Sequence, residues 1–178
     1  MTPTLTAFVN GVRIATGDAP QIAAVLRARA DANEAPPTLL SDADGRVVDI
    51  DLRTPAEVPA TEAAPQARTP RGRPRLGVVP REVTLLPRHW DWLAAQPGGA
   101  SAALRRLVEE ARKTHADTDR RRAQKEAAYR AMSALAGDAT GFEAAARALF
   151  ADDRDALDAL LATWPADVAA YIQARLEA

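Results

Sequence analysis

Residues 70–111 read PRGRPRLGVVPREVTLLPRHWDWLAAQPGGASAALRRLVEEA, and this stretch decides how the middle of the chain folds. An arginine- and proline-rich element comes first, followed by a short alternating stretch, an apolar-patterned segment, a glycine pair and a second apolar-patterned segment. Alternation of apolar side chains predicts a β-strand, whereas apolar spacing of three or four predicts a helix. The sequence therefore predicts a strand, a helix, a turn and a second helix.

Residue chemistry within this stretch fixes where each element is expected to begin and end. Arg81–Leu85 alternate as a strand, and Pro87 suits the first turn of a helix because it has no N–H to leave unpaired. Gly98 and Gly99 end that helix, and Ser101 is a favourable N-cap for the next. The second helix is expected to carry an apolar stripe of Leu104, Leu107, Val108 and Ala111.

The order of elements over roughly residues 79–113 resembles the ribbon-helix-helix family of bacterial DNA-binding proteins. The resemblance implies a homodimer in which the strand pairs with its copy to form a two-stranded ribbon, which enters the major groove of DNA. It also implies that the N-terminus of the second helix binds a phosphate through free N–H groups. The residues implied at the major groove are Arg81, Glu82 and Thr84, and those implied at the phosphate are Ser101, Ala102 and Arg105.

The strand departs from the family pattern, which usually presents two or three long polar side chains to the bases. Here the outward positions hold Glu82 and Thr84, with Leu86 beyond them. Glu82 can accept a hydrogen bond from cytosine but repels phosphate. Two alternatives therefore stay open beside DNA binding: a dimerisation module that binds no DNA, and a plain helical hairpin.

The arginine- and proline-rich element matches the core of an AT-hook. Gly72 and Pro74 keep the backbone narrow and extended, so that Arg71, Arg73 and Arg75 can lie along a minor groove. A·T tracts have narrow grooves whose negative potential attracts inserted arginine. We therefore expect Arg71, Gly72, Arg73, Pro74 and Arg75 to contact the minor groove.

The distribution of charge supports a polyanionic partner, although the net charge is only −1. Residues 68–125 hold fourteen Lys or Arg against six acids, whereas residues 1–67 hold five against nine and residues 126–178 hold four against nine. A basic middle between acidic ends favours DNA as a partner. The alternative is a solvated linker followed by a charged helix face.

The rest of the chain predicts an α+β protein with four segments. Residues 1–53 form a ββαββ unit with a hairpin at Asn10-Gly11, a helix capped by Asp18 and running to about Ala32, and further strands over Thr38–Ser41 and Arg46–Leu52. Residues 54–77 are a Pro/Arg-rich linker, residues 78–114 the ribbon-helix-helix-like segment, and residues 115–178 a C-terminal helical bundle. Within the last segment, Asp117 or Asp119 is expected to cap a helix that ends at Ala136.

Most of the chain also resembles the bacterial domain-of-unknown-function family numbered 2239. Two stretches carry the resemblance, GRPRLGVVPREVTLLPRHWDWLAAQPGGASAALRRLVEEAR at 72–112 and FEAAARALFADDRDALDALLATWPADV at 142–168. The resemblance implies no activity.

The sequence predicts no enzyme, cofactor or metal site. His89 and Asp91 are two residues apart on a helix and point in different directions, and no phosphate-binding glycine motif is present. Asp42, Asp44 and Gly45 lack the longer spacing of a calcium loop. With no cysteine, no signal peptide and no long apolar stretch, we expect a cytoplasmic protein without membrane contact. A DNA-binding regulator or nucleoid-associated factor is the first hypothesis, an interaction module is the second, and an enzyme of an unfamiliar type is the third.

Overall fold

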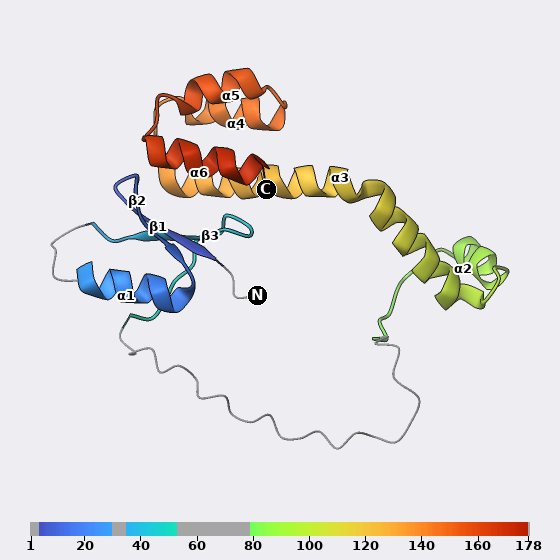
Figure 1. The fold of residues 1–178 in the computed structure, drawn as a ribbon. Helices are drawn as coiled ribbons and strands as arrows, with labels where there is room; N and C mark the ends of the chain where they lie inside the picture. The colour runs from blue at the N-terminus through green and yellow to red at the C-terminus, as the bar shows by residue number, and fades with distance from the viewer. Residues whose placement is uncertain (1–3, 30–34, 53–78, 178) are drawn as a thin grey trace, which may run out of the picture. The chain divides into compact units, whose positions relative to one another are not determined.

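The computed structural model describes residues 4–29, 35–52 and 79–177, which form a mixed α+β structure (Figure 1). A three-stranded antiparallel sheet and one helix come first, and helices follow. The elements are β1 (Leu5–Val9), β2 (Val12–Gly17), α1 (Ala19–Arg29), β3 (Thr38–Ser41), α2 (Pro87–Ala94), α3 (Gly99–Ala136), α4 (Phe142–Phe150), α5 (Arg154–Leu161) and α6 (Ala166–Glu177).

The first hairpin forms where the sequence predicts it. Asn10 and Gly11 have φ values of 50° and 78°, and this left-handed pair turns β1 back onto β2. Such a turn matches the twist of the two strands, which is why Asn-Gly favours it. β3 then pairs antiparallel with the other edge of β1, so the strand order is β2-β1-β3.

Helix α1 begins with reciprocal hydrogen bonds between Asp18 and Gln21. The Gln21 N–H donates to Asp18 Oδ1 at 3.0 Å, and the Asp18 N–H donates to Gln21 Oε1 at 3.0 Å. This capping box satisfies two backbone donors that the first turn would leave without partners. The predicted N-cap at Asp18 is thus confirmed.

The expected strand over Arg46–Leu52 does not form; Val47 makes a single bridge to Leu40. The alternation that predicted the strand is nevertheless real, because Val48, Ile50 and Leu52 pack against the apolar cluster beneath the sheet. Alternating burial reports an extended chain lying on an apolar surface, and it does not require a continuous hydrogen-bonded ladder. Arg27 Nε donates to the Leu52 carbonyl at 3.1 Å and holds the end of this segment.

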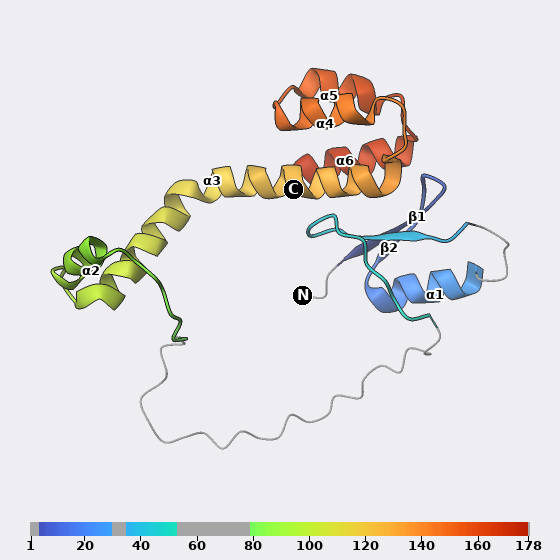
Figure 2. The same cartoon turned by 180° about the vertical axis from the view of Figure 1, so that it is seen from behind.

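The sheet is covered on both faces, and β1 is buried along almost its whole length. Leu5 and Ala7 point to one face, where they pack with Ile22 and Leu26 of α1. Phe8 points to the other face and belongs to the core formed with the C-terminal helices. Figures 1 and 2 show α1 on one side of the sheet and α6 on the other.

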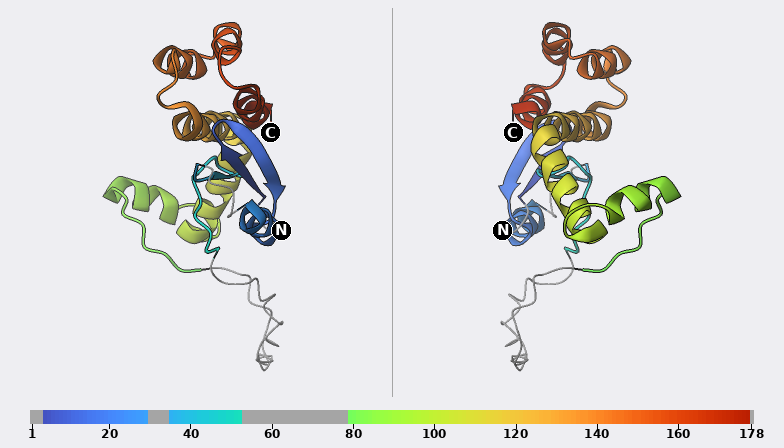
Figure 3. Two further views of the ribbon diagram at one scale, coloured as in Figure 1. Left: turned by 90° about the vertical axis from the view of Figure 1, so that its left-hand side faces the viewer. Right: turned by 90° about the vertical axis from the view of Figure 1, so that its right-hand side faces the viewer.

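The C-terminal helices enclose the larger core. Met132, Leu157, Leu161, Val168 and Ile172 are almost inaccessible to solvent. α4 and α5 lie side by side (Figure 3), and Trp164 Nε1 donates to the Thr140 carbonyl at 3.1 Å. Apolar residues at helical spacing on α4, α5 and α6 face this core, as expected of a helical bundle.

Helix α3 is continuous over 38 residues, which differs from the sequence expectation. It begins at Gly99, so Ser101 lies inside the first turn and is not the N-cap. Asp117 and Asp119 do not begin a new helix; they pair with Arg120 and Arg122 at i+3. No glycine or proline occurs between Gly99 and Gly137, and acidic caps alone do not interrupt a helix.

The chain divides into two compact units. The composite unit contains Met1–Ala56 and Asp117–Ala178, and the middle unit contains Glu57–Ala116. N- and C-terminal segments, which the sequence analysis described separately, therefore share one hydrophobic core. The middle unit contains the predicted DNA-contacting residues.

The backbone at Gly45 passes so close to the backbone of α3 that there is no room for a side chain. Gly45 has φ +69°, and an added Cβ would lie 2.2 Å from the Ala127 carbonyl oxygen. Gly141 also has positive φ, +85°, but its added Cβ would meet only a Leu160 methyl at 3.3 Å. Gly45→Ala is expected to lower the free energy of unfolding by roughly 3 kcal/mol or more, against about 1 kcal/mol for Gly141→Ala. Urea unfolding of both variants measures the difference, and equal losses would contradict the backbone contact.

Candidate nucleic-acid interface

The predicted DNA-contacting residues fall partly outside the described residues. Arg71, Gly72, Arg73, Pro74 and Arg75 lie in the undescribed range 53–78, so the minor-groove prediction stays a prediction. Arg81, Glu82 and Thr84 are described, and all three are exposed. They lie in a segment that this single chain does not form into a strand, because a strand needs a partner and none of the described segments pairs with it.

At the N-terminus of α3 the predicted phosphate site is open to solvent. Gly98 and Gly99 have φ values of 82° and 73°, and this glycine pair turns the chain into the helix. Ser101 is exposed, Ala102 is half-buried and Arg105 is exposed one turn later. Ser101 and Ala102 lie in the first turn, where free N–H groups favour an anion, and the guanidinium of Arg105 follows in the second turn. Phosphate binding there stays a prediction.

The part of α3 in the middle unit has two chemically different faces. At about 100° per residue, the basic side chains of Arg105, Arg106, Arg112 and Lys113 occupy an arc of roughly 120°. Leu104, Leu107, Val108 and Ala111 occupy an arc of roughly 100° centred nearly opposite. The helix therefore separates cations from apolar side chains.

The basic face is incompletely neutralised. Arg112 Nη1 lies 2.9 Å from Glu109 Oε1, an exposed pair one turn apart. Within the described ranges, Arg105, Arg106 and Lys113 have no ion-pair partner. Exposed cations of this kind are available to a polyanion, and they contribute a salt-dependent attraction to it.

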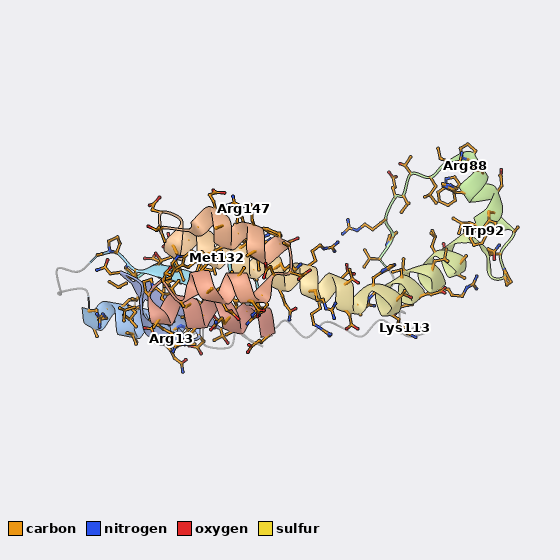
Figure 4. The ribbon with its side chains drawn as sticks, turned by 90° about the horizontal axis from the view of Figure 1, so that it is seen from above. Arg13, Arg88, Trp92, Lys113, Met132 and Arg147 are labelled. Atoms are coloured by element: carbon orange, nitrogen blue, oxygen red, sulfur yellow. The ribbon has the colours of Figure 1, made fainter. Side chains whose placement is uncertain are left out.

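The middle unit holds most of the large apolar side chains that are exposed to solvent among the described residues. Of the twelve large apolar side chains that are exposed among the described residues, seven lie between residues 79 and 108. They are Val79, Val83, Leu86, Trp90, Trp92, Leu107 and Val108. Only Leu93 and Ala103 are buried in this part of the chain. Figure 4 shows Trp92 on α2, and Trp92 is 52 % exposed.

One polar cluster escaped the sequence analysis altogether. Asp42 Oδ1 accepts hydrogen bonds from Thr6 Oγ1 and the Tyr171 hydroxyl, both at 2.9 Å. Arg175 Nη1 donates to the Asp42 carbonyl and lies 3.4 Å from Asp42 Oδ1. The guanidinium also lies 4.7 Å from the centre of the Tyr171 ring. We call Thr6, Asp42, Tyr171 and Arg175 the Asp42 cluster; it joins the sheet to α6.

The environment of the Asp42 cluster favours a structural role over a catalytic or metal-binding one. Burial raises the pKa of Tyr171 far above its ordinary value, and the adjacent Asp42 carboxylate raises it further. The Asp42 carboxylate already has three donors around it, including a cation. Among the described residues no group of three or more His, Cys, Asp or Glu side chains is arranged to hold a metal ion. His89 and His115 are exposed.

The comparison with protein families identifies the chain. A family model described as "Uncharacterized protein conserved in bacteria (DUF2239)" matches residues 4–176. The chain belongs to this family. DUF2239 therefore accounts for nearly the whole sequence, including both stretches that carried the resemblance. No curated protein and no solved structure matches the chain. None of the described helices has the length and apolar character needed to cross a bilayer.

The raised pKa of Tyr171 predicts a loss of stability at alkaline pH. An unfolded tyrosine ionises near pH 10, whereas folded Tyr171 keeps its proton to higher pH. The folded state then binds more protons than the unfolded state, so stability falls as pH rises above about 10, by up to about 1.4 kcal/mol per pH unit. Urea unfolding between pH 8 and pH 11 (roughly the window set by that ionisation) measures this slope.

Tyr171→Phe is expected to unfold more easily at neutral pH, since Asp42 loses a donor, and to show a shallower alkaline slope than the wild type. Tyr129→Phe is the control, because Tyr129 is exposed and lies outside the cluster. An alkaline slope in Tyr171→Phe as steep as in the wild type would refute the assignment to Tyr171.

Proposed function

We propose that this protein is a dimeric DNA-binding protein, a transcriptional regulator or nucleoid-associated factor, whose middle unit supplies both the dimer contact and the DNA contacts. The observation that carries the proposal is the concentration of exposed apolar side chains over residues 79–108, together with a basic arc on α3, the helix that carries Leu107 and Val108. The apolar surface would be covered by a second copy of the chain, and the basic arc would bind a polyanion.

Exposed apolar area supports self-association. Contiguous apolar side chains on a soluble protein mark interaction surfaces, whereas single exposed residues do not. Trp90 and Trp92 are especially suited, because tryptophan contributes heavily at the centres of interfaces. With only Leu93 and Ala103 buried in its described part, the middle unit has little core of its own. A second copy would supply the missing cover.

The backbone of the extended segment supports the same partner. Residues 80–85 make no backbone hydrogen bond within the described part of the chain. An extended segment with free N–H and C=O groups pairs readily with another strand. In a two-fold dimer the natural partner is the same segment of the second copy, which gives an antiparallel ribbon with Val83 on its apolar face. The ribbon-helix-helix arrangement is the form of dimer that we propose.

DNA binding is supported by the free cations on α3 and the open start of that helix. Arg105, Arg106 and Lys113 would contact phosphates, with Ser101 and Ala102 at the helix N-terminus. Glu82 and Thr84 would face the major groove from the ribbon, with Arg81 adjacent to them. The Arg71–Arg75 element would add contacts in the minor groove. In this arrangement most of the affinity comes from phosphate contacts.

One observation favours a second candidate, a dimerisation module that binds no DNA. Glu82 is exposed in the centre of the segment that would read the bases, and Arg112 is already paired with Glu109. Acidic side chains at these positions oppose a phosphate surface. Measurements of mass and of DNA binding separate the two candidates.

A dimer test targets the apolar arc of α3. Light scattering is expected to give the mass of two chains for the wild type and of one chain for Leu107→Glu/Val108→Glu, since two carboxylates cannot be buried without partners. Val47→Glu is the control, because Val47 is 63 % exposed in the composite unit. A monomeric wild type at micromolar concentration would exclude the ribbon.

A DNA test uses the salt dependence of binding to A·T-rich and mixed duplexes. Each lost phosphate contact is expected to reduce the slope of log K against log salt by about 0.9. Arg105→Ala/Arg106→Ala should therefore lower it by roughly 1 to 2, and Arg71→Ala/Arg73→Ala should weaken binding to A·T-rich duplexes most. Arg147→Ala removes an exposed arginine of α4 and is the charge control (Figure 4).

The outcomes discriminate between the candidates. Wild-type protein that shows no salt-sensitive binding leaves only the dimerisation module. If the Arg71→Ala/Arg73→Ala variant binds DNA with unchanged affinity, the proposed minor-groove contacts are excluded and only the contacts proposed for α3 stay.

A further inference from the structure

A cavity in the composite unit combines an apolar floor with a cationic rim. Its volume is about 250 Å³, and it lies between α3, the turn from α4 to α5, and the end of α6. Its apolar lining includes Leu149, Leu157 and Leu176, and its charged lining includes Arg121, Lys125 and Asp152. A neighbouring hollow shares these three charged residues. All of them belong to the composite unit, so the cavity is separate from the residues proposed to bind DNA.

The charges at the rim leave one cation without a partner. Lys125 Nζ lies 2.6 Å from Asp152 Oδ2. Asp153 caps α5 by accepting a hydrogen bond from the Ala156 N–H at 3.1 Å, so its carboxylate is also engaged. Arg121 has no ion pair among the described residues. It is therefore the cation at the rim that an external anion can reach first.

Arg154, the remaining cation at the cavity, is held by other acids. Its Nε donates to Asp158 Oδ2 at 3.1 Å, and its Nη2 lies 3.5 Å from Glu177 Oε1. Hydrogen bonds from Gln173 and then Arg154 lower the pKa of Asp158, so this carboxylate stays charged and keeps Arg154 engaged.

Asp152 occupies a backbone position at which its side chain is unfavourable. Its φ is 60°, in the left-handed region, and it follows the last turn of α4. The next residue's N–H, of Asp153, donates back to the Ala148 carbonyl at 3.0 Å, which is the bond of a Schellman motif. Glycine is usual at this position because it avoids the strain. The side chain of Asp152 therefore carries a conformational cost here, and its carboxylate pairs with the ammonium of Lys125 at the rim of the cavity.

We propose that this cavity binds a small organic monocarboxylate with an apolar body, and that Asp152 is an internal competitor for its carboxylate. The ligand carboxylate would pair with Arg121 and Lys125, and its hydrocarbon would lie on half-buried Leu176 and on the small exposed edges of Leu149 and Leu157. Arginine is suited to this role because its planar donors match a carboxylate. This inference is independent of DNA binding.

Size and polarity select this ligand class. A cavity of about 250 Å³ has room for a small organic acid. A bare phosphate would leave the leucine floor empty, and Asp152 at the rim opposes a multiply charged anion. A neutral apolar molecule would leave the guanidinium of Arg121 unused.

The test is an NMR chemical-shift titration of the full-length protein with sodium hexanoate, and with hexanamide and acetate as matched probes. Hexanoate is expected to saturate with a dissociation constant of about 0.1–1 mM, affecting the amides around Leu149 and Leu157. Hexanamide lacks the charge and acetate lacks the hydrocarbon, so each should bind at least about tenfold more weakly.

Three variants locate the contacts, and their spectra report whether each is folded. Arg121→Gln is expected to weaken hexanoate at least about fivefold. Asp152→Gly removes the competing carboxylate and the left-handed side chain, so it should tighten hexanoate by up to about fivefold, within the strength of an exposed ion pair. Arg147→Gln, on α4 outside both hollows, should leave the affinity unchanged.

Several results would overturn the proposal. Absence of saturable hexanoate binding, equal affinity for hexanamide, or unchanged affinity in a folded Arg121→Gln variant each excludes a carboxylate site at Arg121. Unchanged or weaker binding by Asp152→Gly excludes Asp152 as a competitor.

Discussion

Strand β1 is buried on both faces, and the composite unit is arranged around that constraint. Leu5 and Ala7 are covered by α1, which follows the hairpin directly in the sequence. Phe8 is covered from the far end of the chain, where its ring meets Tyr171 edge-on at 5.3 Å. A strand with two apolar faces needs a layer on each, so the N-terminal sheet and the C-terminal helices form one core. The Asp42 cluster pairs most of the polar groups that this junction encloses, although the buried Arg175 Nε has no hydrogen-bond partner among the described residues.

Elements stabilised by local chemistry could be predicted from the sequence. The Asn10-Gly11 turn, the Asp18 cap and the helical character of the C-terminal segment depend on neighbours within a few residues. The expected strand over Arg46–Leu52 was wrong because alternation identifies a half-buried extended segment without identifying its hydrogen-bond partner. The Asp42 cluster could not be predicted, since Asp42 and Tyr171 are 129 residues apart and no local pattern couples them.

For the candidate DNA interface, the sequence could predict which side chains share a face, but it could not predict what covers that face. Spacing placed Leu107 and Val108 on one face of α3 and the arginines on another, and the helix confirms that separation. Spacing does not say what covers an apolar face, because the cover of Val83, Trp92 and Val108 is not found among the described residues of one chain. The cavity at Arg121 was missed for a related reason: its lining comes from three helices, each of which looks ordinary in the sequence.

The division into units also bears on how this protein can fold during synthesis. The middle unit, Glu57–Ala116, lies in the sequence between the two halves of the composite core, so those halves leave the ribosome at different times. Helix α1 can pack against the sheet as soon as both have been made. The contacts of Phe8 and Asp42 with Tyr171 and Arg175 can form only after the C-terminal helices have been made. Domains usually fold in the order of their synthesis. Here the N-terminal part of the composite core can be completed only when the C-terminal helices have been made, and the middle unit has emerged before them.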